Sequence, residues 1–188
     1  SQGAGRGEEA RAPSAQVASG LLAAALYSLA ALSVQSSHFY TADVLLTFLV
    51  MLGLRLAADL VLGAGVGHRV ALGVAIGLAL ATKLSALPLL LLVPVSSWLR
   101  GLRPLPPSRR QALQASGTAL LAAVATFLVV EPYALLDLRL FLADSLRESQ
   151  IAWGRLDVPY TRQFAGTLPY LYSAWQTLLW GMGVPAEL

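Results

Sequence analysis

The sequence predicts an all-α integral membrane protein, a bundle of several spanning helices with an amphipathic surface helix in an outer loop. Of its residues, 56% are hydrophobic and only 12% are charged, whereas a soluble domain carries about 25% charged residues. The mean hydropathy is +0.65, and long runs such as Val17–Val34 hold no charge at all. The chain has no cysteine, which excludes disulfides and thiolate metal sites.

The first 16 residues form a polar loop or linker rich in Gly, Ala, Glu and Arg, and they do not resemble a signal peptide. Since the sequence starts at Ser1 without Met, we expect a piece of a longer protein that begins in a loop. The region 17–130 holds the membrane helices. Val17–Val34 is the first, and its small residues suit close helix packing in lipid.

A second span covers Val44–Val66 and is interrupted by Arg55 and Asp59. These two residues are four apart, so on a helix they share a face and can form an ion pair. The glycine-rich run 63–67 ends this helix, and we expect the following His68-Arg69 pair to lie in a loop.

The apolar segment 70–98 is longer than the ~20 residues that cross a bilayer, and it carries Lys83 near its middle. It could form two short helices folded as a hairpin, or one long, tilted and kinked helix. The charge map favours the hairpin, because the basic loops on both sides of the segment are cytoplasmic by the positive-inside rule. The tip of the hairpin, at Lys83, then points toward the outer face. The residues that set this orientation are His68, Arg69, Arg100, Arg103, Arg109 and Arg110.

Ala112–Val130 is the next span, and the region 131–168 that follows is extracytoplasmic by parity. Apolar residues recur there at helical spacing, which favours an amphipathic helix on the membrane surface over a plain soluble loop helix. They are Leu135, Leu138, Phe141, Leu142 and Leu146. The aromatic-rich stretch 169–188 begins a further membrane helix, which brings the total to about six membrane segments with the hairpin counted as two.

One outer face then collects His38, Asp43, Lys83, Glu131 and the loop 157–163. A carboxylate can bind a divalent cation or accept a proton, and a Lys or Arg can neutralise a phosphate. Both signs of charge at a bilayer surface suit an amphiphile with a phosphorylated head, although each charge could simply anchor its helix at the interface. The two histidines lie in different loops, so the need for a metal stays open. The net charge of +3 is small, and nucleic-acid binding has little support.

Three segments carry a family resemblance: SHFYTADVLLTF at 37–48, GLALATKLSA at 77–86, and PYTRQFAGTLPY at 159–170 followed by WGMGVP at 180–185. In this order and spacing they resemble the polyprenyl-phosphate-sugar-dependent glycosyltransferases of the GT-C class. The likeness is greatest to bacterial members of the dolichyl-phosphate-mannose protein mannosyltransferase family.

The resemblance implies an inverting transferase in the plasma membrane. It would move a sugar from a polyprenyl-phosphate donor to a protein, lipid or glycan acceptor on the extracytoplasmic face. Members of the family use an acidic residue in their first outer loop as the general base. That loop would precede Ser1, so no catalytic residue is expected in these residues, and the fragment alone is expected to be inactive.

The resemblance also implies roles for individual residues. Lys83 matches the family lysine and is the candidate for neutralising the donor phosphate, and Asp43 matches the aspartate at the helix start. His38 stands where eukaryotic relatives often carry Arg, so it could contact the phosphate, bind a metal or only pack. Tyr160, Arg162 and Gln163 are expected to line the donor or acceptor entrance.

Two other classes of function fit the same residues. A segment of a secondary transporter would use Lys83 at a broken helix to bind its substrate, although the sequence has no internal repeat. A non-catalytic membrane scaffold is the third interpretation, and the gathering of charge on one face disfavours it.

Overall fold

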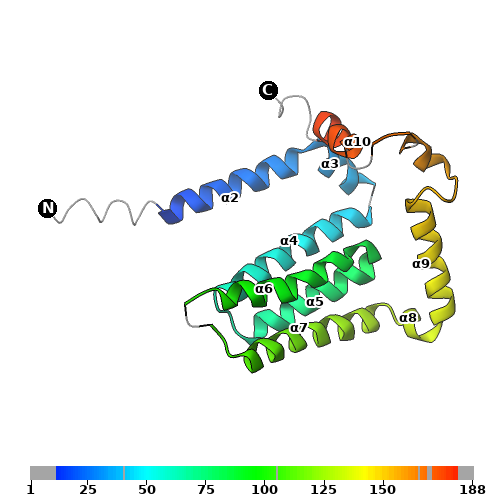
Figure 1. Ribbon diagram of the computed structural model, residues 1–188. Coiled ribbons are helices and arrows are strands. Elements are labelled where there is room, and N and C mark those ends of the chain that lie inside the picture. Colours follow the sequence, from blue (N-terminus) through cyan, green and yellow to red (C-terminus); the bar gives the residue numbers. More distant parts are fainter. Residues whose placement is uncertain (1–11, 40, 105, 165, 169–170, 182–188) are drawn as a thin grey trace. The chain divides into compact units, whose positions relative to one another are not determined.

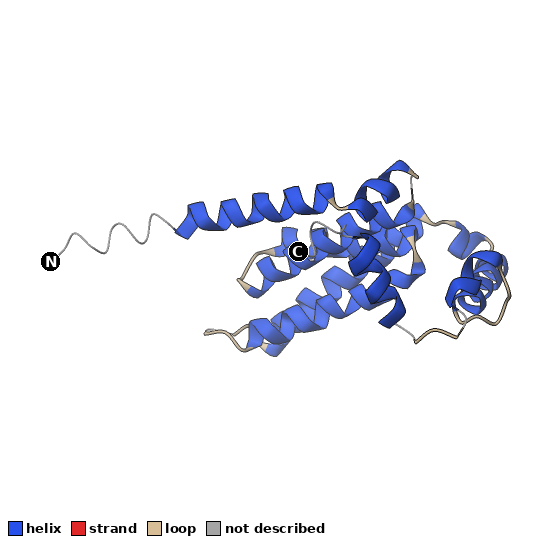
Figure 2. Ribbon diagram, turned by 90° about the horizontal axis from the view of Figure 1, so that it is seen from above, coloured by secondary structure: helices blue, strands red, loops and turns tan. Residues whose placement is uncertain are grey.

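A computed structural model describes residues 12–181 apart from Tyr40, Leu105, Ala165 and residues 169–170. All regular elements in this described part are helical, as Figure 2 shows, which confirms the all-α prediction. The chain divides into two compact units, one made of residues 1–41 and 166–188 and the other of residues 42–165.

The first unit contains α2 (Ala12–Leu29) and α3 (Ala31–His38), which meet at a bend of 59°. Ala30 at the bend has extended backbone angles, φ −63° and ψ 129°. The expected span Val17–Val34 is divided at Ala30 into two helices, which form a broken span if this stretch crosses a membrane. In the region expected to begin a further span, the described helical residues are α10 (Leu171–Gln176) and the π-helical turn η3 (Thr177–Gly181).

The second unit is built on four long segments (Figure 1). They are α4 (Ala42–Val61), α5 (Val66–Thr82), the 3₁₀-helix η1 (Leu84–Leu91) continued by α6 (Leu92–Gly101), and α7 (Arg109–Val130). They pack as a ring, in which α4 contacts α5, α5 contacts α7, α7 contacts α6 and α6 contacts α4. The shorter α8 (Tyr133–Leu136), α9 (Leu138–Ala152) and the 3₁₀-helix η2 (Pro159–Phe164) follow.

Small residues let the central helices of this ring approach closely. Gly73 and Gly77 lie one turn apart on α5, against Ala119 and Ala123 of α7. A Cβ added at Gly77 would lie 2.5 Å from the carbonyl oxygen of Ala123, and one at Gly73 would collide with the carbonyl oxygen of Ala119. Spacing of this kind is the small-xxx-small pattern of helix pairs packed in lipid.

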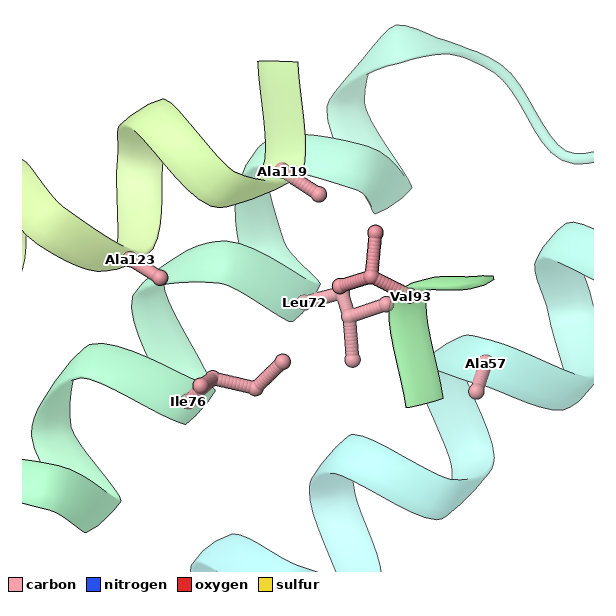
Figure 3. Close-up of a cluster of buried hydrophobic side chains, with 6 residues drawn as sticks. All are labelled: Ala57, Leu72, Ile76, Val93, Ala119 and Ala123. Atoms are coloured by element: carbon pink, nitrogen blue, oxygen red, sulfur yellow. The ribbon is translucent and has the colours of Figure 1, made fainter. Parts of the chain in front are cut away.

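The buried apolar cluster in the middle of the ring draws on all four segments (Figure 3). Leu72 and Ile76 of α5 are fully buried there, next to side chains from α4, α6 and α7, namely Ala57, Val93, Ala119 and Ala123. Most larger apolar side chains point outward instead, among them Phe48 on α4, at 61% exposed, and Leu121 on α7, at 72%. Apolar surface of this extent marks an interaction with a membrane or a partner.

Three helical segments in the described part are long and apolar enough to cross a membrane: α4 with 20 residues, η1–α6 with 18 and α7 with 22. The bent pair of the first unit would make a fourth. The helix α5 is shorter, and its 17 residues extend about 25 Å at about 1.5 Å per residue. Because 3₁₀ residues rise about 2 Å each, η1 and α6 together reach about 31 Å. These helices are consistent with a membrane protein.

Local chemistry explains where the helices of this ring begin and end. The hydroxyl of Ser108 accepts from the backbone N–H of Gln111, whose side chain accepts from the N–H of Ser108, so this capping box starts α7. At the other end, Pro132 disfavours helical angles at Glu131, and α7 stops there. His68 and Arg69 were expected in a loop, and that expectation is wrong, because α5 already begins at Val66.

Candidate functional site

A cavity of about 1010 Å³ lies at the end of the second unit where α4 begins, α5 ends and α7 ends. The short helix α8 and one face of α9 complete its walls. Apolar side chains form much of the lining, with Leu80 from α5 and Leu84 and Leu87 from η1 on one side and Phe127 and Phe141 on the other. The two phenylalanine rings meet edge to face, with centroids 6.2 Å apart.

Lys83 lines this cavity at the break between α5 and η1. Its backbone is extended, φ −162° and ψ 124°, which ends the α-helix and lets the chain reverse into η1. Its Nζ donates a hydrogen bond of 2.8 Å to Oδ1 of Asp43, in the first turn of α4. Both side chains are at least half exposed. An ammonium has three N–H donors, so a single bond to Asp43 leaves donors for a ligand.

Carboxylates at the end of α7 and along α9 share the same cavity. Glu131 ends α7, and Asp144 and Glu148 lie one turn apart on α9. A fourth, Asp137, caps α9, because its Oδ1 accepts from the backbone N–H of Leu140 at 3.0 Å. The cavity thus combines one ammonium with several groups that accept hydrogen bonds from hydroxyls.

The sequence did not identify Asp144 and Glu148 as residues that line a cavity, since its pattern places them on the solvent-exposed face of a surface helix. The available signal was their spacing with Phe141 and Ser145, which places all four on one face of α9. The leucines of the amphipathic pattern that belong to α9 fall on a different face and remain exposed, namely Leu138, Leu142 and Leu146. Leu135 of α8 is exposed as well.

The described residues hold no grouped set of metal ligands. No group of three or more His, Asp or Glu side chains among them could hold a metal ion.

The other residues predicted for the site are placed as follows. His38 ends α3 in the first unit, where its ring meets the ring of Phe39 edge on, with centroids 5.6 Å apart. Arg162 lies on η2 and forms two hydrogen bonds of 2.8 Å with the carboxylate of Asp157. The side chains of Tyr160 and Gln163 lie outside the described part of the structure. Of the predicted set, the structure joins Lys83 with Asp43.

The pair Arg162–Asp157 is fully exposed and lies away from the cavity lining. The hydrogen bonds from Arg162 lower the pKa of the Asp157 carboxyl below its ordinary value. The same bonds raise the pKa of the Arg162 guanidinium, which stays charged. The pair links Asp157, which precedes η2, to Arg162 on that element.

Comparison with known proteins gives no match: no family model, no curated protein and no solved structure is significantly similar to the chain.

Proposed function

We propose that the chain is part of a membrane glycosyltransferase that takes its sugar from a polyprenyl-phosphate donor. The observation that carries the proposal is Lys83, whose ammonium stands at a helix break on the wall of a cavity of about 1010 Å³ at one end of the helical unit. That volume is at the upper end of the range of ligand pockets, about 300–1,000 Å³.

The side chains that line the cavity suit both the phosphate and the sugar of such a donor. The donor phosphate accepts hydrogen bonds from the free N–H groups of Lys83, while Asp43 keeps the ammonium at the cavity. Sugar hydroxyls donate to carboxylates, which Glu131, Asp144 and Glu148 supply. The several carboxylates disfavour a bare phosphate and favour a neutral, hydroxyl-rich group next to the charged one.

The surroundings of the cavity suit the apolar polyprenyl chain of the donor. Leu80, Leu84 and Leu87 line it on the side of α5 and η1, and these elements belong to the apolar ring. The exposed leucines of α9 would bury themselves in the membrane interface, as amphipathic surface helices do. Under the positive-inside rule this end of the ring is extracytoplasmic.

In the transfer step, the acceptor hydroxyl oxygen bonds to the anomeric carbon of the sugar. The bond between that carbon and the phosphate oxygen breaks, and the polyprenyl phosphate leaves with the electron pair. Lys83 stabilises the charge that develops on the leaving phosphate. The hydroxyl proton passes to a carboxylate base, which members of the resembled family carry in their first outer loop.

Donor binding tests the proposal directly. The protein is reconstituted in nanodiscs, and its affinity for a synthetic polyprenyl-phosphate-mannose is measured for the original chain, Lys83→Ala and Lys83→Arg. Loss of a charge-assisted hydrogen bond is worth about 1.5–3 kcal/mol, so Lys83→Ala should weaken binding roughly 10- to 100-fold. Lys83→Arg keeps the charge and should retain most of the affinity.

Arg55→Ala is the matched control, because Arg55 is 76% exposed and pairs with Asp59 near the opposite end of α4. Its donor affinity should equal that of the original chain. Equal donor affinity of Lys83→Ala and of the original chain would contradict the proposal. Accumulation of an unmodified solute in proteoliposomes, with no donor binding, would identify a transporter instead.

A further inference from the structure

A second cavity, of about 420 Å³, lies at the opposite end of the same four-segment ring. It is bounded by the end of α4, the start of α5, the second half of α6 and the first turns of α7. Its floor is the buried cluster, through Leu72 and Val93. None of its lining residues lines the cavity of Lys83.

Two guanidinium groups dominate the chemistry of this cavity. Arg69 from α5 and Arg100 from α6 both line it and are half-buried. No carboxylate stands among the described residues of its lining. The nearby carboxylate of Asp59 pairs with Arg55, with 3.0 Å between Oδ2 and Nε. The same Oδ2 lies 3.9 Å from Nε2 of His68. The positive charge of the cavity is therefore not neutralised from its own walls.

The backbone is shaped to accommodate one of these groups. Gly63 has φ +104°, and a Cβ added there would lie 3.1–3.2 Å from the guanidinium atoms of Arg100. Only glycine adopts this backbone angle without strain. The guanidinium of Arg100 donates a long hydrogen bond of 3.5 Å from Nη1 to the carbonyl oxygen of Val61. Arg100 is thus held close to the chain while most of its N–H donors stay open to a ligand.

Hydroxyl donors complete the lining. Ser97 of α6 and Ser116 of α7 share a hydrogen bond of 3.0 Å across the helix pair, and both line the cavity. Two guanidinium forks with hydroxyls beside them match the oxygens of a phosphate, which arginine binds with two parallel hydrogen bonds.

We propose that this cavity binds a phosphate-bearing anion, and that its source is the headgroup of an anionic phospholipid. The apolar helices around the cavity are suited to a bilayer. Basic pockets between membrane helices on the cytoplasmic side bind anionic headgroups, and this end of the ring is the one that the positive-inside rule assigns to the cytoplasm. A soluble phosphate compound offers the same chemistry, and the experiment separates the two sources.

The test compares two double variants that remove the same charge. Arg69→Gln with Arg100→Gln empties the cavity of its guanidinium groups. Arg103→Gln with Arg109→Gln removes two exposed arginines at the same end that do not line it. The full chain is reconstituted in vesicles of equal parts phosphatidylcholine and phosphatidylglycerol, and the lipids it retains are counted by native mass spectrometry.

The original chain should retain phosphatidylglycerol in preference to phosphatidylcholine. The Arg69/Arg100 variant should lose that preference by roughly 10- to 100-fold, as two bidentate contacts imply, while the Arg103/Arg109 variant keeps it. Equal loss in both variants, or no preference in the original chain, would overturn the proposal, because the attraction would then be a general surface effect.

A second arm measures binding of inorganic phosphate to the detergent-purified chain by calorimetry. Tight binding that requires Arg69 and Arg100, with no preference among lipids, overturns the lipid source and assigns the site to a soluble phosphate compound. If the double Gln variant does not fold, as judged by gel filtration and circular dichroism, the single variants replace it. Each should weaken retention several-fold, and unchanged retention in both would overturn the proposal.

Discussion

The two ends of the unit 42–165 carry opposite chemistry on one scaffold. At one end, a cavity of about 1010 Å³ joins a single ammonium, Lys83, with carboxylates from α7 and α9. At the other, a cavity of about 420 Å³ holds the guanidinium groups of Arg69 and Arg100 among hydroxyls. The long helices form a scaffold that the two cavities share. The residues where these helices begin and end determine what each cavity can bind.

Tightly packed helices separate the two cavities. Small residues bring α5 and α7 into direct backbone contact there, and Leu72 and Ile76 fill the remaining space. This packing leaves no room for a larger side chain, and no residue lines both cavities.

The largest effect is expected from Gly77→Leu. A leucine on this face of α5 would have to displace the backbone of α7 at Ala123, since even a Cβ would lie 2.5 Å from its carbonyl oxygen. Overpacking of this kind costs about 3 kcal/mol, and both cavities should lose their ligands together. Unfolding of the reconstituted chain by a denaturing detergent measures the loss.

Gly117→Leu is the control for that experiment. Gly117 lies on α7, and an added Cβ there meets nothing within 4 Å. The stability of this variant should stay near that of the original chain. Similar losses in both variants would show that glycine content alone, and not the contact between α5 and α7, sets the stability.

The next largest effect is expected when the binding of both ligands is measured in the variants of each cavity. Lys83→Ala should weaken polyprenyl-phosphate-mannose binding by roughly 10-fold or more and leave phosphatidylglycerol retention unchanged. The double Arg69/Arg100 variant should show the reverse pattern. A variant at one end that alters both ligands while keeping its stability would contradict the independence of the two ends.

A smaller effect is expected at the capping box of the basic end. Ser108→Ala removes the hydroxyl that accepts from the N–H of Gln111, at 3.3 Å, and should cost about 1 kcal/mol of unfolding free energy. Thr118→Ala is a suitable control, because its hydroxyl only bonds the carbonyl of Gln114 within the same helix. Equal stability of the Ser108 variant and the original chain would show that the cap adds nothing.

The smallest effect concerns the exposed pair Asp157–Arg162. The pKa of Asp157 lies below its ordinary value of 3.8 because Arg162 donates two hydrogen bonds to it. The stabilisation is therefore fully present above pH 3.8 and is lost as the pH falls through the lower pKa of the folded state. Arg162→Gln should raise the pKa of Asp157 toward its ordinary value in an NMR titration, and an unchanged pKa would argue against the pair.

The sequence by itself determined the fold class and much of the helix map. Composition required apolar helices, because so few charged residues cannot cover a soluble globule. The four-residue spacing of Arg55 and Asp59 predicted their ion pair, which the structure confirms at 3.0 Å. Periodicity and charge are local properties of the chain, so they could be read without knowing what packs against what.

Only the tertiary structure decided which residues meet. The contact of Lys83 with Asp43 joins positions forty residues apart, and the approach of Asp144 and Glu148 to the same cavity depends on which way α9 turns after Asp137. The cavity of Arg69 and Arg100 likewise forms only when α5 and α6 are in place. Such contacts follow from the packing of side chains across helices, and spacing along one chain segment does not encode them.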